Sequence, residues 1–440
     1  MKNALSAMGR RTAPPPISWL MQAALSRPQI ISLAAGFTDS ATLPVKISRQ
    51  VLNRVLRSSK TGQPALQYGI TAGETNLRQL TARHLQTLDQ SPSSLSSSLQ
   101  RKSRTSTKDE DDKIHSWERT MITGGSQQLL YMTVEALGDE GDIVLVEDPT
   151  YFVFLSILQS RGLRARGVRL ERDGLDLGHL ETVLQRLKKS GGLRRTKALY
   201  LISYFHNPTG VTTSFEKKRG VLKLLKKFEG AAGHPIYLIE DAAYRELRFK
   251  GPDIRSALMV PGAAERVIYT GTYSKPYAPG ARVGFGILPK LLFTAVQRIK
   301  GNHDFGTANL LQQLLAGELK TGLYDRHVAK IRTRYGRKAQ GMKQALARHF
   351  PSNVEIWESG GGLYFWTRLP KNISTGVKSK VFRTALKNDV LYVPGELCYA
   401  DDPSRPKPDH EMRISFGSAS EADIREGIKR LGKVLRKYCP

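Results

Sequence analysis

Short apolar runs alternate with amphipathic segments through the middle of the chain. Five runs have the length and the β-branched content of buried strands, and they cover residues 120–123, 142–147, 198–203, 236–240 and 267–270. Apolar residues recur at helical spacing between them, as over 126–137, 177–189 and 214–229. Strands that alternate with helices predict an α/β fold, in which a mainly parallel sheet is covered by helices on both faces.

The pattern changes after about residue 310. It predicts a long helical stretch over 310–350, a glycine turn at 360–362, strands over 363–369, 391–393 and 412–416, a helix around 378–388 and a final helix. This mixture is typical of a smaller α+β domain. We therefore predict an N-terminal segment (1–50) that packs on the small domain, a large domain (51–310) and a small C-terminal domain (311–440).

Residues 90–113 differ in composition from the rest of the large domain. They are rich in Ser, Lys and Asp and contain almost no apolar residues. Such a segment buries too little apolar surface to fold by itself, so we predict an inserted surface loop. A tolerated insertion fits this composition better than a regulatory or interaction segment, which stays an alternative.

Composition and charge narrow the class of protein. A hydrophobic content of 40% in 440 residues is typical of a globular chain with a large core. No apolar run approaches the roughly 18 residues of a membrane helix, and the N-terminus lacks the apolar core of a secretion signal. The two cysteines favour neither a metal cluster nor a disulfide framework, so we expect no metal site and a cytoplasmic location, with an organelle presequence left open.

The net charge of +29 raises the question of nucleic-acid binding. The basic residues are spread along the chain, and many lie in segments that also carry apolar residues at helical spacing. No basic stripe is interleaved with aromatic residues. This distribution favours solvated helix faces over a nucleic-acid site, and we expect no nucleic-acid partner.

The most informative polar motif lies just after the strand predicted at 267–270. Thr272 and Ser274 precede Lys275, and Arg282 follows it. Hydroxyls and a guanidinium bind phosphate, whereas an amine attacks a carbonyl carbon. The combination points to a cofactor with both an aldehyde and a phosphate, which is pyridoxal 5'-phosphate. Taken alone, the stretch is also compatible with a basic surface turn.

Two further segments carry groups that this cofactor requires. Residues 124–127 lie between a predicted strand and a predicted helix, so the glycines and the helix N-terminus form a candidate phosphate cradle. Tyr151 follows the strand 142–147 and offers an aromatic face for the pyridine ring. Each signal is weak by itself, since strand-to-helix turns are common and a tyrosine there also fits a packed core.

Polar residues after later strands complete the set. Asp241 ends an apolar strand, where a carboxylate is costly unless a cation such as a protonated ring nitrogen pairs with it. Tyr244 and Asn207 are placed to bind the ring oxygen, although Asn-Pro-Thr-Gly also fits a plain β-turn. Arg413, in an apolar strand, is suited to clamp a substrate carboxylate, with a structural salt bridge as the alternative.

These segments together resemble the class I/II aminotransferases of fold type I, within the branch of aminoadipate, kynurenine and broad aromatic or branched-chain enzymes. The likeness covers residues from about 31 to 435. It rests on Gly-Ser-Gln-Gln, Asp-Pro-Thr-Tyr, Asn-Pro-Thr-Gly, Glu-Asp-Ala-Ala-Tyr-Arg-Glu-Leu, Ser-Lys-(x)3-Pro-Gly-x-Arg and Met-Arg-Ile-Ser-Phe in family order. The resemblance implies a seven-stranded, mainly parallel sheet of the pyridoxal-phosphate transferase type.

The resemblance also implies roles. Lys275 would form the Schiff base and carry the proton, Asp241 would pair with the ring nitrogen, and Tyr244 would bind the ring oxygen. The other cofactor contacts would come from Ser126, Gln127, Tyr151, Asn207, Thr272, Ser274 and Arg282. Arg413, Asn207 and Gly36 would contact the substrate. Tyr68 would reach the phosphate of a neighbouring subunit, which implies a homodimer with shared sites.

The implied reaction moves an amino group between an amino acid and a 2-oxo acid, with 2-oxoglutarate as acceptor, by a ping-pong mechanism. Residues 14–26 contain no arginine, unlike the dicarboxylate-specific members, which leaves the choice of amino acid open. Two alternatives remain. A carbon–sulfur β-lyase would use the same cofactor motifs, and a ligand-sensing transcription regulator would need a DNA-binding domain, for which the roughly 30 residues before Ile31 are too few.

Overall fold

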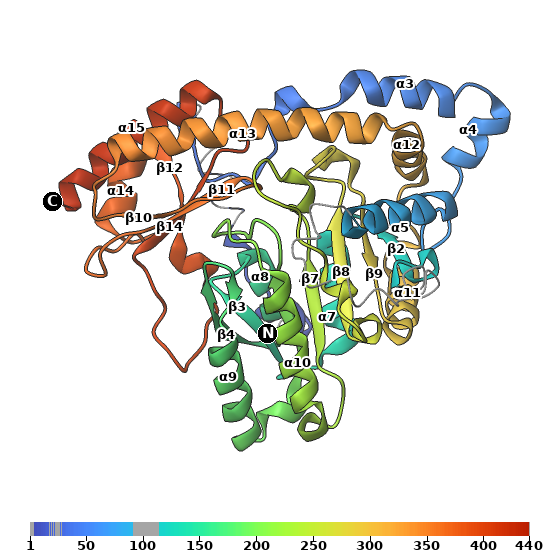
Figure 1. The fold of residues 1–440 in the computed structure, drawn as a ribbon, viewed down its shortest axis with the longest axis horizontal. Coiled ribbons are helices and arrows are strands. Elements are labelled where there is room, and N and C mark those ends of the chain that lie inside the picture. The colour runs from blue at the N-terminus through green and yellow to red at the C-terminus, as the bar shows by residue number, and fades with distance from the viewer. Residues whose placement is uncertain are drawn as a thin grey trace, which may run out of the picture.

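The structure, a computed structural model, describes residues 4–439 apart from 17, 19, 21, 23–26, 28 and 91–113. The predicted insertion therefore lies outside the described residues except for its first residue, and so does most of the segment 14–26. A large and a small sheet lie side by side, and one long helix, α13 (Leu323–His349), extends above both of them (Figure 1). None of the described helices is long and apolar enough to cross a membrane.

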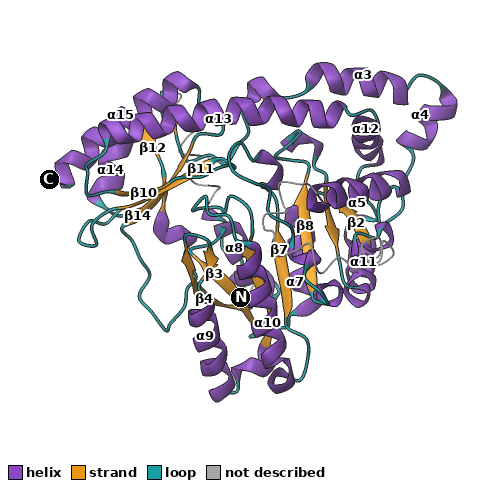
Figure 2. Ribbon diagram, viewed as in Figure 1, coloured by secondary structure: helices purple, strands orange, loops and turns teal. Residues whose placement is uncertain are grey.

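The large sheet has eight strands in the order β2-β9-β8-β7-β6-β3-β4-β5. Figure 2 shows the strands in orange with helices, in purple, around them. They are β2 (Thr120–Thr123), β3 (Ile143–Asp148), β4 (Arg164–Glu171), β5 (Gly174–Leu175), β6 (Thr196–Ile202), β7 (Tyr237–Asp241), β8 (Val267–Thr272) and β9 (Gly284–Ile287). Strand β9 runs antiparallel to β2 and β8, β5 runs antiparallel to β4, and the other pairs are parallel. The α/β class is confirmed. The eighth strand, β5, has only two residues, which is too short to leave a periodic pattern.

Both faces of the central strands β3, β6 and β7 are buried, which explains why most of their residues are apolar. In β6, Tyr200 and Ile202 belong to one hydrophobic cluster, and Leu199 and Leu201 belong to the other. The first cluster includes residues of α7 (Ser126–Leu137), α8 (Phe152–Arg161) and α11 (Lys290–Asp304). The second includes residues of α5 (Thr75–Gln90), α9 (Leu177–Lys189) and α10 (Phe215–Ala232).

The small sheet is antiparallel, in the order β10-β11-β14-β13. Its strands are β10 (Glu355–Trp357), β11 (Tyr364–Arg368), β13 (Val393–Pro394) and β14 (Glu411–Ser415), and its helices are α14 (Lys380–Lys387) and α15 (Glu421–Tyr438). In a two-stranded sheet, β1 (Ile31–Ser32) pairs in parallel with β12 (Val390–Leu391). The predicted strand 391–393 is therefore divided between β12 and β13, which belong to different sheets.

The helical stretch predicted over 310–350 is two helices, α12 (Asn309–Lys320) and α13 (Leu323–His349). Gly322 between them has a φ of 67°, the left-handed conformation that favours glycine and ends a helix. Because the apolar spacing continues across this turn, the sequence pattern merged the two helices.

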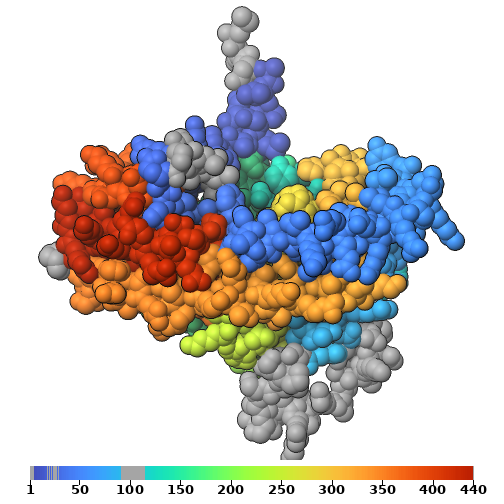
Figure 3. All heavy atoms as spheres, turned by 90° about the horizontal axis from the view of Figure 1, so that it is seen from above, coloured from blue at the N-terminus to red at the C-terminus, as the bar shows by residue number. Residues whose placement is uncertain are grey.

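The N-terminal residues contact both parts of the molecule. Whereas β1 pairs with a strand of the small domain, α1 (Ala7–Arg11) lies against α8, where Arg11 Nε donates to the carbonyl of Ser160 at 2.8 Å. The helix α3 (Val45–Val55) packs on α12 and leads into α4 (Ser59–Leu66). Figure 3 shows α3, in blue, extending beside α13, in orange, across the upper face.

Candidate active site

The loops that follow five strands meet at one edge of the large sheet. Strands β2, β3, β6, β7 and β8 all point toward this edge, where ligands bind in open α/β sheets. The residues predicted from sequence that follow these strands are Ser126, Gln127, Tyr151, Asn207, Asp241, Tyr244, Ser274, Lys275 and Arg282. The small domain adds Arg413 from β14, whose NH1 donates to Oδ1 of Asn207 at 2.7 Å. Residues far apart in sequence thus converge between the large and the small sheet.

Lys275 follows β8, and its amine donates to the carbonyl oxygen of Gly36 at 2.8 Å. Burial lowers the pKa of Lys275 from its ordinary value of 10.5 to about 8, and the positive charges of Arg413 and Arg282 act in the same direction. A lysine in this environment loses its proton near pH 8, so a fraction of it is already neutral at pH 7. The neutral amine is the form that attacks a carbonyl carbon.

Asp241 is the last residue of β7, and it is buried. Its carboxylate accepts from the Tyr200 hydroxyl at 2.7 Å and from the backbone N–H of Ala243 at 3.0 Å. Burial raises the pKa of Asp241, since the described chain places neither lysine nor arginine within ion-pair distance. A buried carboxylate whose partners are neutral fits a positively charged ring N–H.

The candidate phosphate cradle lies where α7 begins. Arg282 NH1 is 3.4 Å from the Ser274 hydroxyl, and its NH2 donates to the carbonyl of Gly124 at 3.2 Å. A Cβ atom on Gly284 of β9 would lie 2.5 Å from the backbone nitrogen of Ser126. The glycine therefore allows the helix N-terminus to sit directly against the sheet, beside the guanidinium, which is an arrangement that binds phosphate.

The hydroxyl of Thr272 makes two hydrogen bonds to backbone groups. It accepts from the backbone N–H of Ser274 at 3.1 Å and donates to the carbonyl of Val283 at 3.4 Å. These bonds hold the turn before Lys275. Tyr151, at the start of α8, is partly buried, and burial raises the pKa of its hydroxyl, which keeps the ring neutral.

Arg413 is only 1% exposed, yet the described residues give it no carboxylate partner. Its guanidinium donates to Asn207 and, at 2.6 Å, to the carbonyl of Ala34, while Nε has no hydrogen-bond partner. The structural salt bridge considered from the sequence is therefore not found within the described chain. A buried cation with neutral partners fits an incoming carboxylate.

Gly36 and Tyr68 lie in different surroundings. The carbonyl of Gly36 holds Lys275, and a Cβ on this glycine would be 2.5 Å from the hydroxyl oxygen of Tyr364. Tyr68 is 83% exposed and packs edge-on against Phe305, with ring centroids 5.4 Å apart. Its ring is thus turned to the surface of this chain.

Tyr200 and Tyr364 also lie in the site, although no sequence motif singles them out. Tyr200 lies within the apolar strand β6 and donates to Asp241. Tyr364 begins β11, and its hydroxyl lies 2.8 Å from that of Tyr244. In the sequence each tyrosine resembles any other aromatic residue of a buried strand, so no local signal separates them from the core.

The chemistry of these groups fits a pyridoxal-phosphate enzyme. An amine with a lowered pKa suits an aldehyde, a buried acid without a cationic partner suits a protonated ring nitrogen, and a helix N-terminus beside a guanidinium suits a phosphate. The Nε of Arg413, which has no hydrogen-bond partner, suits a substrate anion.

Comparison with known proteins supports this class. The profile of the family "Aminotransferase class I and II" matches residues 28–431, and the chain belongs to this family. It is 32% identical to 2-aminoadipate transaminase of Thermus thermophilus over 93% of this chain and 91% of that protein. It is 31% identical to aromatic-amino-acid aminotransferase 1 of Thermococcus litoralis over 93% of this chain and 88% of that protein.

A solved structure agrees. Kynurenine aminotransferase of Pyrococcus horikoshii, determined in complex with PMP, matches with a TM-score of 0.84 and 28% identity, over 99% of this chain and 98% of that chain. The protein is therefore an enzyme, a transaminase, with the fold of type I pyridoxal-phosphate enzymes, and its cofactor is pyridoxal phosphate.

The position of Lys275 predicts a pH dependence. In cofactor-free protein, the rate of reductive modification of Lys275 by a small aldehyde should rise with pH and reach half its maximum near pH 8, because only the neutral amine reacts. Peptide mass spectrometry measures the rate. Arg413→Met removes a nearby positive charge and should move the midpoint upward, whereas Arg413→Lys should not. A midpoint near the ordinary 10.5 in the unaltered protein would contradict the prediction.

The close contact at Gly284 predicts a loss of cofactor affinity. A methyl group there pushes against the Ser126 backbone, and overpacking of this kind costs about 1–3 kcal/mol, so Gly284→Ala should bind pyridoxal phosphate roughly tenfold more weakly. Gly280→Ala is the matched control, since nothing lies within 4 Å of its added Cβ. Equal dissociation constants for the two variants, at equal melting temperatures, would rule out the proposed cradle.

Proposed function

We propose that this transaminase transfers the amino group of an amino acid to 2-oxoglutarate by a ping-pong mechanism. The observation that carries the proposal is the convergence of Lys275, which is partly buried, with Asp241 and Arg413, which are buried, at one edge of the sheet. The hydrogen-bond partners of all three groups are neutral. Each matches a different part of the reaction: the amine, the ring nitrogen and the substrate carboxylate.

Bound pyridoxal phosphate supplies an electron sink for the electrons of the substrate Cα. Lys275 would hold the cofactor through its aldehyde carbon, and its amine, with a lowered pKa, would take the proton from the substrate Cα. Asp241 would keep the ring nitrogen protonated. Tyr244 and Asn207 would donate to the ring oxygen, and Tyr151 would cover the face of the cofactor ring.

Arg413 accounts for the ping-pong order. An amino acid and a 2-oxo acid share the same α-carboxylate, and one guanidinium serves both. Because both carboxylates would bind the same guanidinium of Arg413, the amino acid and the 2-oxo acid occupy the same place in turn. The first product therefore leaves before the second substrate enters.

The surroundings of Arg413 favour aromatic and large apolar amino acids as donors. Its guanidinium carbon lies 4.3 Å from the centre of the Tyr364 ring and 5.5 Å from that of Phe152. Residues 14–26 provide no arginine for a second carboxylate. The names of the related enzymes from Thermococcus litoralis and Pyrococcus horikoshii, for aromatic amino acids and kynurenine, support this choice.

We also propose a homodimer with shared sites. Leu66, Tyr68, Ile70 and Phe305 are exposed large apolar residues. The rings of Tyr68 and Phe305 pack edge to face, which brings residues 66–70 beside Phe305. The Asn309 amide donates to the carbonyls of Pro64 and Gln67 at 2.8 and 3.2 Å, which holds the segment before Tyr68. A second copy covering this patch would receive Tyr68 at its phosphate cradle.

Two free, buried cysteines support a reducing compartment, for which we propose the cytoplasm.

A donor panel tests the reaction. Aromatic and branched-chain amino acids should give glutamate from 2-oxoglutarate, and Lys275→Ala should lose at least about 10³-fold of this activity together with the cofactor absorbance. Lys290→Ala, which removes an exposed lysine, is the control. If a sulfur-containing amino acid instead gives pyruvate, ammonia and a thiol without amino transfer, the enzyme is a β-lyase and the proposal fails.

Complementation tests the shared site. Lys275→Ala and Tyr68→Ala chains, co-expressed with different tags, form heterodimers in which one of the two sites has both residues intact. Random pairing should then restore about a quarter of the wild-type activity, well above either variant alone. Heterodimers that show no gain over the separate variants would mean that Tyr68 does not serve the partner's site.

A further inference from the structure

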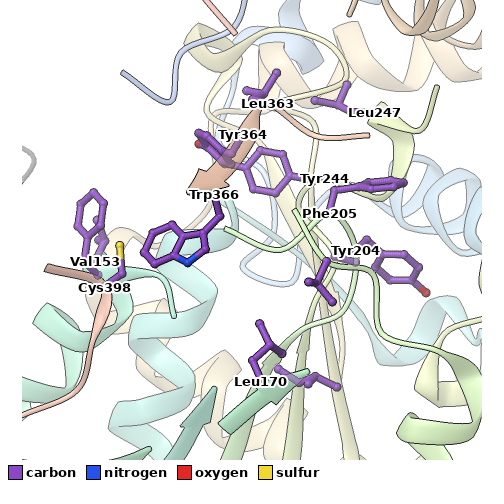
Figure 4. Close-up of a cluster of buried hydrophobic side chains, with 14 of the residues drawn as sticks. Val153, Leu170, Tyr204, Phe205, Tyr244, Leu247, Leu363, Tyr364, Trp366 and Cys398 are labelled. Carbon is purple, nitrogen blue, oxygen red and sulfur yellow. The ribbon is translucent and has the colours of Figure 1, made fainter. Parts of the chain in front are cut away.

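Tyr364 joins the two domains inside the site. It begins β11 of the small domain and is 2% exposed, whereas Tyr244 follows β7 of the large domain. Their hydroxyl oxygens are 2.8 Å apart, and their rings meet edge to face with centroids 5.6 Å apart. Figure 4 shows the two rings beside each other, with Trp366 farther along the same strand.

The same side chain contacts the other functional groups. The guanidinium carbon of Arg413 lies 4.3 Å from the centre of the Tyr364 ring, which is within cation–π distance. The Tyr364 hydroxyl also faces Gly36, where an added Cβ would be 2.5 Å away, and the carbonyl of Gly36 holds Lys275 at 2.8 Å. Tyr364 therefore contacts Arg413 and Tyr244 and lies against Gly36, whose carbonyl holds Lys275.

The hydrogen bond between the Tyr244 and Tyr364 hydroxyls acquires a defined donor and acceptor when the cofactor is bound. A phenol has one proton to donate and lone pairs to accept. If Tyr244 donates its proton to the cofactor ring oxygen, its own oxygen is left to accept from Tyr364. Tyr364 O–H then donates to Tyr244, and this polarises the Tyr244 O–H bond and makes it the stronger donor.

We propose that Tyr364 is a positioning residue that orients and strengthens the Tyr244 hydrogen bond to the cofactor and links it to Arg413 across the domain boundary. The inference rests on the proposed role of Tyr244 at the ring oxygen. Tyr364 itself need not touch the cofactor. Because its ring lies on Arg413, a carboxylate that binds the guanidinium acts on the same side chain that supports Tyr244.

A purely structural Tyr364 would behave differently. Loss of its hydroxyl would then lower stability, as the loss of any buried hydrogen bond does, and leave the cofactor unaffected. Tyr392 provides the matched control. It is fully buried in the same domain, and its hydroxyl donates to the carbonyl of Thr375 at 2.8 Å, away from the groups described above.

The test is a pH titration of the absorbance of the bound cofactor in the holoenzyme. A hydrogen-bond donor to the ring oxygen draws off negative charge that would otherwise stabilise the protonated form of the bound cofactor. A weaker donor therefore favours protonation of the cofactor. Tyr364→Phe should therefore raise the pKa of the bound-cofactor absorbance by about half a unit. Tyr392→Phe should leave this pKa unchanged, although it should lower the melting temperature about as much as Tyr364→Phe does. An unshifted titration in Tyr364→Phe overturns the inference.

Tyr244→Phe separates this inference from the proposed function. It should raise the same pKa by more than Tyr364→Phe, and the double variant should show no shift beyond that of Tyr244→Phe alone. If Tyr244→Phe shifts the titration and Tyr364→Phe does not, the role of Tyr244 stands and the positioning role of Tyr364 is wrong. If neither shifts it, the assignment of Tyr244 itself fails.

The link to Arg413 has its own measurement. Tyr364→Leu removes the aromatic face, so the KM for the amino acid should rise several-fold beyond that of Tyr364→Phe, which keeps the ring. The absorbance titrations of the two variants should agree, because both lack the hydroxyl. Equal KM values for folded Phe and Leu variants would refute the coupling.

Discussion

Burial of charge without a counter-ion is the constraint on which this site depends. Many other charged side chains of the described interior are paired, such as Lys218 with Glu240 at 2.9 Å and Arg245 with Asp89 at 2.7 Å. Arg78 and Glu318 are also buried, but they bond to backbone carbonyls and to a tyrosine hydroxyl. Asp241 and Arg413 are as deeply buried, and their described partners are neutral. Leaving an ionisable group in this state costs several kcal/mol, which only a large folded domain can offset. The charges of cofactor and substrate are what these groups lack.

The site exists only where separate parts of the chain meet. Arg413 reaches Asn207 from the small domain, Gly36 holds Lys275 from the N-terminal segment, and the Tyr364 and Tyr244 hydroxyls join the two domains. Each of these contacts crosses from one structural unit to another. The relative position of the domains therefore sets both the electrostatics of the lysine and the geometry around the cofactor ring. This arrangement explains how carboxylate binding on one side can influence the ring on the other.

Sequence patterns were accurate where structure is local. The predicted helices 126–137 and 177–189 match α7 and α9 in full, because amphipathic spacing and neighbouring turn residues decide both ends. They were inaccurate where a short break carries little signal, as at Gly322 between α12 and α13. Strand β9 had no strand-like pattern, since Gly284 and Gly286 have low β propensity. They are needed because a Cβ on Gly286 would lie 2.2 Å from Leu129 of α7.

The motifs alone were sufficient to name the cofactor and the residues at the ends of β2, β3, β6, β7 and β8, because parallel strands bring their following loops to one edge whatever the side-chain packing. Tertiary structure was needed to show that Arg413 has no acidic partner in the described chain, that Tyr200 supports Asp241 and that Tyr364 touches Tyr244. These contacts depend on which side chains face one another in the folded chain. Tyr364 and Tyr244, and likewise Arg413 and Asn207, are more than a hundred residues apart in sequence. Pairing of this kind follows from the packing of two domains, and no local pattern of residues contains it.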